Sequence, residues 1–119
     1  MSWRIVQTKR GLNYNYLSTP PLSGKPVILF LHGFPSTSND WHHQVGYFSA
    51  KGFGLVVPDM LGYGGTDKPT KLKDYSLNNM AADMIDILDA ESIKKCFAAG
   101  HDWSVYLRLP ANYLQSHLR

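Results

Sequence analysis

The sequence is poor in cysteine and lacks any long hydrophobic run. Cys96 is the only cysteine in 119 residues, which excludes an internal disulfide and a thiolate metal cluster and predicts a reducing compartment, by default the cytoplasm. The longest apolar run, residues 27–31, is far shorter than the roughly 20 residues that a helix needs to cross a bilayer. Residues 1–10 lack the apolar segment of a signal peptide. We therefore expect no membrane segment and no targeting sequence.

Charge of one sign is not concentrated anywhere either. Twelve basic and 9 acidic residues give a net charge of +3, and no block of lysine or arginine marks a nucleic-acid-binding face. With 44% hydrophobic and 18% charged residues, the composition is that of an ordinary globular protein with one domain at most. We expect no nucleic-acid partner.

The first part of the chain has the pattern of a β-hairpin followed by a buried strand. Residues 2–8 and 12–17 alternate polar and apolar side chains, and Lys9, Arg10 and Gly11 between them form a predicted turn. Residues 27–31 are continuously apolar, which is typical of a central parallel strand buried on both faces.

Helices and strands then alternate. Asp40 is expected to cap a helix over residues 41–51, which Gly52 would end in a left-handed conformation, and residues 55–57 are the next buried strand. Further along, Ser76 is expected to cap a helix whose apolar stripe comprises Leu77, Met80, Ala81, Met84, Ile85 and Leu88.

Residues 95–99 form the last predicted strand. The order hairpin, strand, helix, strand, helix, strand predicts an α/β fold, in which a parallel sheet carries helices on its faces. Ligands of such sheets bind at the carboxyl ends of the strands. Three unusual clusters follow strands there, at residues 32–35, 59–69 and 100–104.

The third cluster points to a carboxylate nucleophile. Gly100, two places before Asp102, allows the sharp strand-to-helix turn that exposes a reactive side chain. A carboxylate attacks saturated carbon that carries a leaving group and forms an ester. Two alternatives stay open: Asp102 as a simple helix cap, and Ser104 as a serine nucleophile on a shifted turn.

The first cluster offers hydrogen-bond donors for an oxyanion. The backbone amides of Phe34 and Trp103 are the predicted oxyanion hole. His32 is expected to form structural hydrogen bonds rather than to act as a base. Gly33 permits a turn, and Pro35 restricts Phe34 to an extended conformation and allows a cis peptide bond that would fix the direction of the amide.

The glycines of the second cluster do not form a nucleotide site. Gly62 and Gly64 are followed by Asp67 where a dinucleotide-binding loop has its third glycine. We expect these glycines to form tight turns instead.

The three clusters, including His101 beside Asp102 and in this order, resemble those of epoxide hydrolases of the α/β-hydrolase fold. The resemblance extends to about Trp103. It implies that Asp102 opens a small apolar epoxide, which ends as a vicinal diol, and that no cofactor or metal is used. It also implies that two cap-domain tyrosines protonate the leaving oxygen and that a histidine paired with an acid activates the hydrolytic water. Haloacid and haloalkane dehalogenases of this fold share the aspartate, although haloalkane enzymes usually have asparagine in place of Phe34.

The resemblance also implies that much of the enzyme is missing. In this family the cap, the acid and the histidine all follow the nucleophile, but 119 − 102 = 17 residues remain. Residues 1–119 are thus expected to be a partial domain, truncated after the nucleophile turn. His117, the only later histidine, would point away from the ester, and His42 and His43 are predicted to be solvated on a surface helix.

Two positions depart from the family pattern. Ser104 stands where the family usually has glycine, and Pro110 interrupts the following helix, which is therefore expected to be short or kinked. The strand over residues 95–99 would become an exposed edge. Two hypotheses follow: a hydrolase that attacks its substrate but cannot turn over alone, and a non-catalytic binding partner of a full-length relative.

Overall fold

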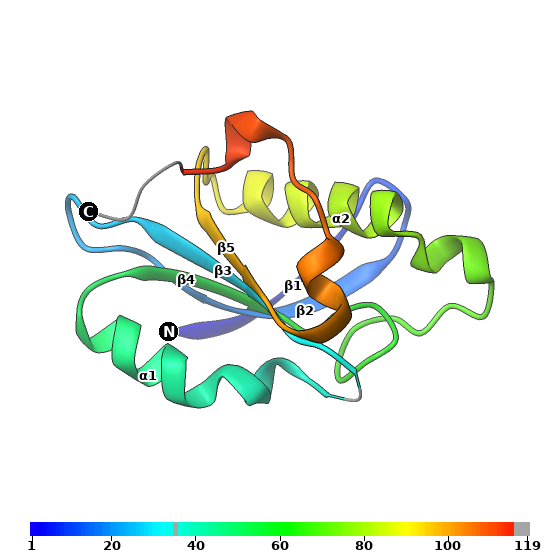
Figure 1. Ribbon diagram of the computed structural model, residues 1–119, viewed down its shortest axis with the longest axis horizontal. Helices are drawn as coiled ribbons and strands as arrows, with labels where there is room; N and C mark the ends of the chain where they lie inside the picture. The colour runs from blue at the N-terminus through cyan, green and yellow to red at the C-terminus, as the bar shows by residue number, and fades with distance from the viewer. Residues whose placement is uncertain (35, 116–119) are drawn as a thin grey trace.

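The computed structural model describes residues 1–34 and 36–115, which form a mixed five-stranded sheet between helices (Figure 1). The strand order is β1-β2-β4-β3-β5. β1 and β2 form the predicted antiparallel hairpin, β2 pairs antiparallel with β4, and β3 pairs parallel with both β4 and β5. The bounds are β1 Ser2–Gln7, β2 Asn13–Thr19, β3 Val27–Leu31, β4 Gly54–Pro58 and β5 Phe97–Gly100. The predicted α/β class is confirmed.

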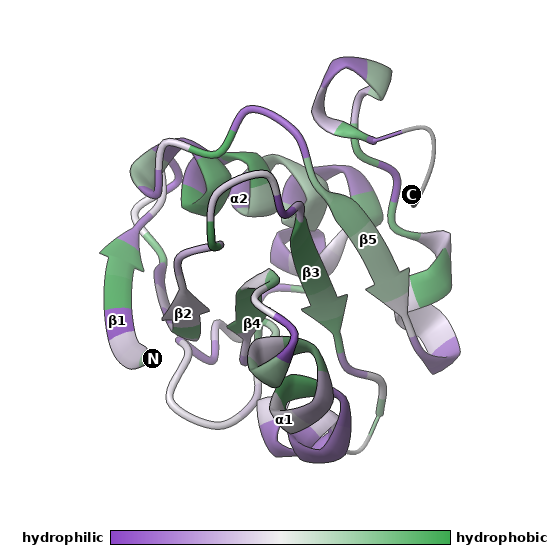
Figure 2. Ribbon diagram, turned by 90° about the vertical axis from the view of Figure 1, so that its left-hand side faces the viewer, coloured by the Kyte–Doolittle hydropathy of each residue, from purple (hydrophilic) through white to green (hydrophobic). Residues whose placement is uncertain are grey.

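β3 and β4 form the centre of the core. Every residue of both strands is buried, as the unbroken apolar runs predict. Because side chains alternate along a strand, Leu29 and Leu31 pack in the cluster that contains α2 (Leu77–Ala90), whereas Ile28 and Phe30 pack with Val45 of α1 (His42–Ala50). Figure 2 shows β3 and β4 between the two helices.

The start of α1 differs from the expectation. A 3₁₀ turn, η1 (Ser38–Trp41), precedes the helix, and the hydroxyl oxygen of Thr37 accepts its capping hydrogen bond from the Asn39 amide at 3.3 Å. The prediction of Asp40 as the cap was wrong, because the helical backbone already begins with the preceding turn. The predicted end is confirmed, since Gly52 has φ +87° just after the last helical turn.

α2 begins at Ser76 as predicted, and the Ser76 hydroxyl oxygen accepts a hydrogen bond from the Asn79 amide at 3.2 Å. Met80, Ala81, Met84 and Leu88 of the predicted stripe are buried. Ile85 is half-buried and packs against the same core, as predicted, whereas the prediction was wrong for Leu77, which is exposed.

Asp83 of α2 is also fully buried, although aspartate was not expected on the core face. The Arg10 guanidinium donates to both Asp83 carboxylate oxygens at 3.0 and 2.5 Å, and the Tyr14 hydroxyl donates to Asp83 Oδ2 at 2.6 Å. Arg10 also contacts Asp74 of the 3₁₀ turn η2 (Leu72–Tyr75) at 3.4 Å. These bonds compensate the buried charge and fasten the hairpin turn to α2.

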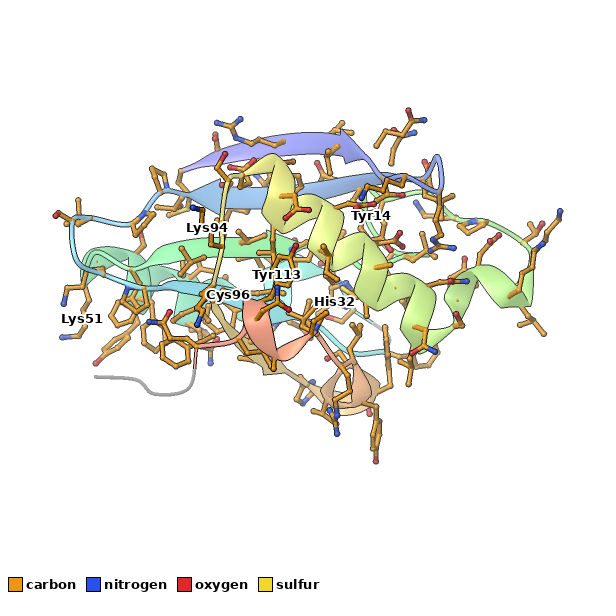
Figure 3. All side chains as sticks on the ribbon, turned by 90° about the horizontal axis from the view of Figure 1, so that it is seen from above. Tyr14, His32, Lys51, Lys94, Cys96 and Tyr113 are labelled. Atoms are coloured by element: carbon orange, nitrogen blue, oxygen red, sulfur yellow. The ribbon has the colours of Figure 1, made fainter. Side chains whose placement is uncertain are left out.

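The segment after β5 folds back on the core. The helix after the turn is only the 3₁₀ segment η3 (Asp102–Tyr106), so the expected shortening is confirmed. After a second 3₁₀ turn, η4 (Ala111–Tyr113), Leu114 forms a parallel bridge with Cys96, whose amide donates to the Tyr113 carbonyl oxygen at 2.9 Å (Figure 3). Leu107 and Leu109 lie in the core, whereas Ala98 and Gly100 of β5 are exposed. No helix among the described residues is long and apolar enough to cross a membrane.

Candidate active site

The three predicted clusters meet at one edge of the sheet, where His32 links two of them. The His32 ring is fully buried, and its Nε2 accepts a hydrogen bond from the Met60 amide at 2.8 Å. Nδ1 must then carry the proton, which it donates to the Gly33 carbonyl oxygen at 2.8 Å. Burial lowers the pKa of His32. His32 is therefore a neutral hydrogen-bonding residue, as the sequence analysis expected.

Asp102 occupies a sharp turn between β5 and η3. Its φ is +60°, a left-handed conformation that non-glycine residues seldom adopt and that costs about 1–3 kcal/mol. The cap position of η3 belongs to His101, so the alternative of Asp102 as a simple helix cap is wrong. The Asp102 side chain is exposed. The Asp102 side chain is thus exposed on a strained backbone just after the end of β5, as a reactive group in such a turn would be.

The turn requires two glycines for close approach. A Cβ on Gly33 would lie 2.5 Å from the Asp102 Cβ, and a Cβ on Gly100 would lie 2.9 Å from the Ser104 carbonyl oxygen. Carbon atoms pack at about 3.5–4.0 Å, so neither loop could keep its position with a larger residue. The first and third clusters are thus packed backbone to backbone.

The Ser104 side chain is buried under this turn and does not reach the exposed side on which Asp102 lies. It is 1% exposed, and its hydroxyl accepts from the His101 amide at 2.8 Å and lies 2.8 Å from the Leu31 carbonyl oxygen. The alternative of a serine nucleophile is wrong for this geometry. The hydroxyl accounts for serine at a position where the resembled family usually has glycine, because it links β3 to the turn.

The Phe34 amide, one of the two expected oxyanion donors, lies in contact with Asp102. The Phe34 backbone N–H donates to Asp102 Oδ2 at 3.2 Å. The second expected donor, the Trp103 amide, follows Asp102 in the chain, and its role stays a prediction. Pro35 was expected to support this loop, and His117 was not expected to act as the base. Both residues lie outside the described residues.

Asp59 follows β4 and was given no role of its own from the sequence. Its side chain links three segments of the site by hydrogen bonds. Its carboxylate is buried and accepts hydrogen bonds from the Ser38 amide at 2.9 Å, the Gly65 amide at 3.1 Å and the Asn15 side-chain amide at 3.1 Å. Burial alone would raise the pKa of Asp59, but these donors hold it below its usual range. An acidic residue directly after a buried strand was the available signal.

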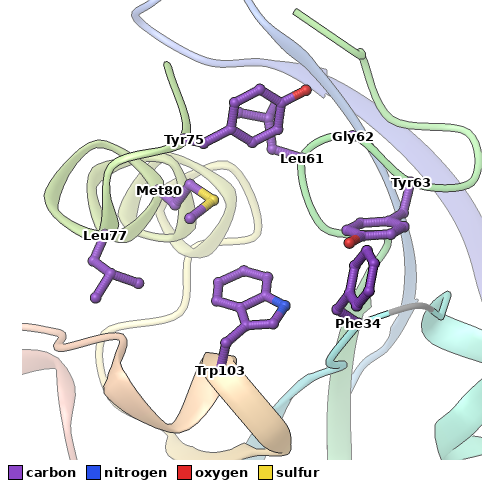
Figure 4. Close-up of a pocket in the computed structure, with 8 residues that line it drawn as sticks. All are labelled: Phe34, Leu61, Gly62, Tyr63, Tyr75, Leu77, Met80 and Trp103. Carbon is purple, nitrogen blue, oxygen red and sulfur yellow. The ribbon is translucent and has the colours of Figure 1, made fainter. Parts of the chain in front are cut away.

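The loop after Asp59 contains the tight turns that its glycines predicted. Gly62 and Gly64 have φ of +91° and +53°. This loop forms one wall of an open groove of about 550 Å³, which Trp103, the residue after Asp102, also lines (Figure 4). The groove is lined by Phe34, Leu61, Gly62, Tyr63, Tyr75, Leu77, Met80 and Trp103.

The groove is mostly apolar and aromatic, and its size falls in the range of about 300–1,000 Å³ that is usual for small-molecule sites. The groove was not predicted from the sequence, because the spacing of Leu77 and Met80 indicated only the core stripe of α2. The described residues contain no group of three histidine, cysteine, aspartate or glutamate side chains that could hold a metal ion. His42 and His43 are exposed on α1, as expected.

Known proteins resemble the chain in both sequence and structure. Residues 26–104 match the sequence model of a family described as alpha/beta hydrolase fold. Epoxide hydrolase 2 of Siraitia grosvenorii is 34% identical over 104 residues, which are 87% of this chain and 33% of that protein. Epoxide hydrolase 4 of Mus musculus is 40% identical over 93 residues, which are 78% of this chain and 25% of that protein.

Solved structures give the same result. The crystal structure of an epoxide hydrolase from Vigna radiata superposes with a TM-score of 0.80 at 30% identity, over 89% of this chain and 32% of that one. Epoxide hydrolase A from Mycobacterium thermoresistibile gives a TM-score of 0.77 at 31% identity, over 86% and 31%. The chain spans a quarter to a third of the curated relatives it matches.

Proposed function

The chain belongs to the α/β-hydrolase fold family, and from this premise we propose that it carries the substrate-attack part of an epoxide hydrolase, with Asp102 as the nucleophile. In this proposal residues 1–119 are the N-terminal part of the hydrolase domain. The observation that carries the proposal is the contact between the Asp102 carboxylate and the Phe34 amide in a strained, exposed turn. A structural aspartate would need neither the strain nor the exposure.

The hydrogen bond from the Phe34 amide gives the two carboxylate oxygens of Asp102 different roles. Asp102 Oδ2 is held by the Phe34 N–H at 3.2 Å, which leaves Oδ1 as the attacking atom. Oδ1 forms a bond to one epoxide carbon as the bond from that carbon to the epoxide oxygen breaks, and the freed oxygen takes the electron pair and then a proton from water. The product is an ester between Asp102 and a hydroxyalkyl group.

Hydrolysis of this ester would use the same amide. Water adds to the ester carbon, and the negative charge that develops on Oδ2 is stabilised by the Phe34 N–H and by the predicted second donor, the Trp103 amide. His32 cannot activate this water, because both of its ring nitrogens are already hydrogen-bonded. We therefore propose that the ester accumulates on this chain unless a base is supplied from beyond the described residues.

The groove supports a small apolar epoxide as the substrate. Trp103 follows Asp102 in the chain, and the Phe34 amide contacts the Asp102 carboxylate; both side chains line the groove together with aliphatic and aromatic side chains. An aryl-substituted epoxide such as styrene oxide would place its ring against these residues while its strained carbons meet the carboxylate. No cofactor enters this chemistry.

The experiment is to incubate the folded chain with styrene oxide and follow its intact mass. We expect one covalent adduct, its loss in Asp102→Asn, and its retention in the matched control Asp40→Asn, since Asp40 is exposed on η1. If Asp102→Asn forms as much adduct as the parent chain, the proposal is wrong. Adduct formation with a haloacid but not with an epoxide would identify a dehalogenase of the same fold instead.

A second candidate is a binding partner of a full-length relative, and one observation favours it. β5 is last in the strand order, and the described residues add to its outer side only the bridge between Cys96 and Leu114, so this edge could pair with another chain. Co-purification with a full-length epoxide hydrolase, together with no adduct on the folded chain, would support this candidate. A cytoplasmic location stays a prediction that depends on the single cysteine.

A further inference from the structure

The Ser104 hydroxyl lies where the end of β3 meets the backbone that carries Asp102. It accepts a hydrogen bond from the His101 amide at 2.8 Å, and its oxygen lies 2.8 Å from the Leu31 carbonyl oxygen and 2.7 Å from the His101 carbonyl oxygen. A hydroxyl has one proton, so it donates to one of these carbonyls at a time. Because the Ser104 side chain is buried, water does not compete for these bonds.

These bonds differ from those of the helix-capping hydroxyls. The hydroxyl oxygens of Thr37 and Ser76 each accept from an amide two or three residues away, which orders only the turn in which they lie. The Ser104 hydroxyl also contacts the Leu31 carbonyl oxygen, 73 positions earlier in the chain. It therefore joins two loops of the site, which a capping role alone does not account for.

The same two loops are bonded a second time at Asp102 itself. The Phe34 amide donates to Asp102 Oδ2 at 3.2 Å, and the His101 amide also donates to the Leu31 carbonyl oxygen at 3.1 Å. Phe34 lies three positions after Leu31, and Asp102 directly follows His101. The bonds at Leu31 therefore set the position of the Asp102 carboxylate relative to the Phe34 amide.

Asp102 needs such support because its backbone is strained. Its φ of +60° is a conformation that persists in a non-glycine residue only where the surrounding structure enforces it. The hydrogen bond from the His101 amide to the Ser104 hydroxyl starts just before Asp102 and ends two residues after it. This bond spans the strained residue and opposes its relaxation.

We propose that Ser104 is a positioning residue for the attack on the epoxide; this inference rests on the proposed function. The Ser104 hydroxyl keeps Asp102 in its strained turn, so that Oδ2 stays on the Phe34 amide and Oδ1 is free to attack. Ser104 touches no reacting atom and acts only through Asp102. The epoxide hydrolases that the chain resembles usually have glycine at this position, so the hydroxyl bridge is a feature of this chain.

The test is Ser104→Ala, which keeps the Cβ and removes the hydroxyl. A misplacement of about 1 Å costs about 10²-fold in rate, and we expect a fall of this size in the rate constant for the Asp102 adduct with styrene oxide. The rate is followed by intact mass and divided by the folded fraction, which circular dichroism gives. The matched control is Ser18→Ala, which removes another buried hydroxyl, one that donates to Glu91 at 3.0 Å from β2; this variant should react at the parent rate.

Two further measurements separate positioning from general stabilisation. Sucrose favours the folded state but does not replace the hydroxyl, so the slow reaction of Ser104→Ala should persist in sucrose. In amide NMR spectra of the free chain, the Phe34 amide proton should move upfield in Ser104→Ala, because it loses its hydrogen bond to the Asp102 carboxylate. The same proton should not move in Ser18→Ala.

Recovery of the parent rate in sucrose would overturn the inference, because Ser104 would then only stabilise the fold. A folded Ser104→Ala chain that reacts at the parent rate, or whose Phe34 amide proton does not move, would overturn it too. If Ser104→Ala does not fold, Ser104→Gly removes the same hydroxyl and is held to the same outcomes. If the parent chain forms no Asp102-dependent adduct, the proposed function fails, and the Phe34 resonance still decides whether Ser104 positions Asp102.

Discussion

Substitution of Gly33 by alanine should disable the oxyanion loop while the fold remains intact. The added Cβ would lie 2.5 Å from the Asp102 Cβ and 2.9 Å from the His101 carbonyl oxygen. Because carbon atoms pack at about 3.5–4.0 Å, the loop must move by roughly 1 Å. The hydrogen bond from the Phe34 amide to Asp102 Oδ2 is already 3.2 Å long, so this shift breaks it.

The loss should appear in the hydrolysis of the ester rather than in its formation. Removal of one oxyanion donor slows such a step by about 10²–10³-fold, or about 2.7–4 kcal/mol. The assay forms the adduct first, transfers it to alkaline buffer in which hydroxide replaces the missing base, and follows its decay by intact mass. We expect the Gly33→Ala adduct to decay about 10²-fold more slowly than the parent adduct.

The matched control is Gly46→Ala. Gly46 lies inside α1, a Cβ there would meet nothing within 4 Å, and the change should stabilise the helix by about 0.5–1 kcal/mol. This variant should decay at the parent rate. If a folded Gly33→Ala adduct also decays at the parent rate, the Phe34 amide is not an oxyanion donor, and the reasoning from close packing is refuted.

Two predictions concern stability. Arg10→Met leaves the buried Asp83 carboxylate without its cation, so the free energy of unfolding measured in urea should fall by about 3–5 kcal/mol. The control is Lys9→Met, because the Lys9 ammonium is exposed, and it should change the free energy of unfolding by less than about 0.5 kcal/mol. Equal losses in the two variants would contradict the role given to Arg10. Because burial lowers the pKa of His32, the unfolded chain takes up a proton that the folded chain refuses, so stability is complete above pH 6.5 or so and falls below it. His32→Gln should flatten that slope in urea titrations across this range; a slope as steep as in the parent chain would show that His32 is not its source.

Local patterns were sufficient to predict the strands and the meeting of the clusters. The continuous apolar run at residues 27–31 required burial on both faces, and residues 12–17 alternate in burial as their pattern predicted. The half-buried strand predicted for residues 2–8 was wrong, because β1 is exposed at every position except the partly buried Val6. Because parallel strands present their carboxyl ends together, the loops that follow them had to meet. These inferences needed only neighbours in sequence.

What the sequence did not reveal depends on contacts between distant residues. Asp83 lies on the core face of α2 only because Arg10 and Tyr14, about 70 positions earlier, supply its hydrogen bonds. Several capping residues occur together before α1, and the loop path decided in favour of Thr37 over Asp40.

The most direct test of the central claim is to locate the adduct by peptide mapping after the folded chain has reacted with styrene oxide. Cys96, the one thiol, is buried, and its pKa is raised to about 11 by burial, so it should not compete. We predict a single ester on Asp102 that is released by alkali as the diol. An adduct on any other residue, or none on a chain shown to be folded, would contradict the account.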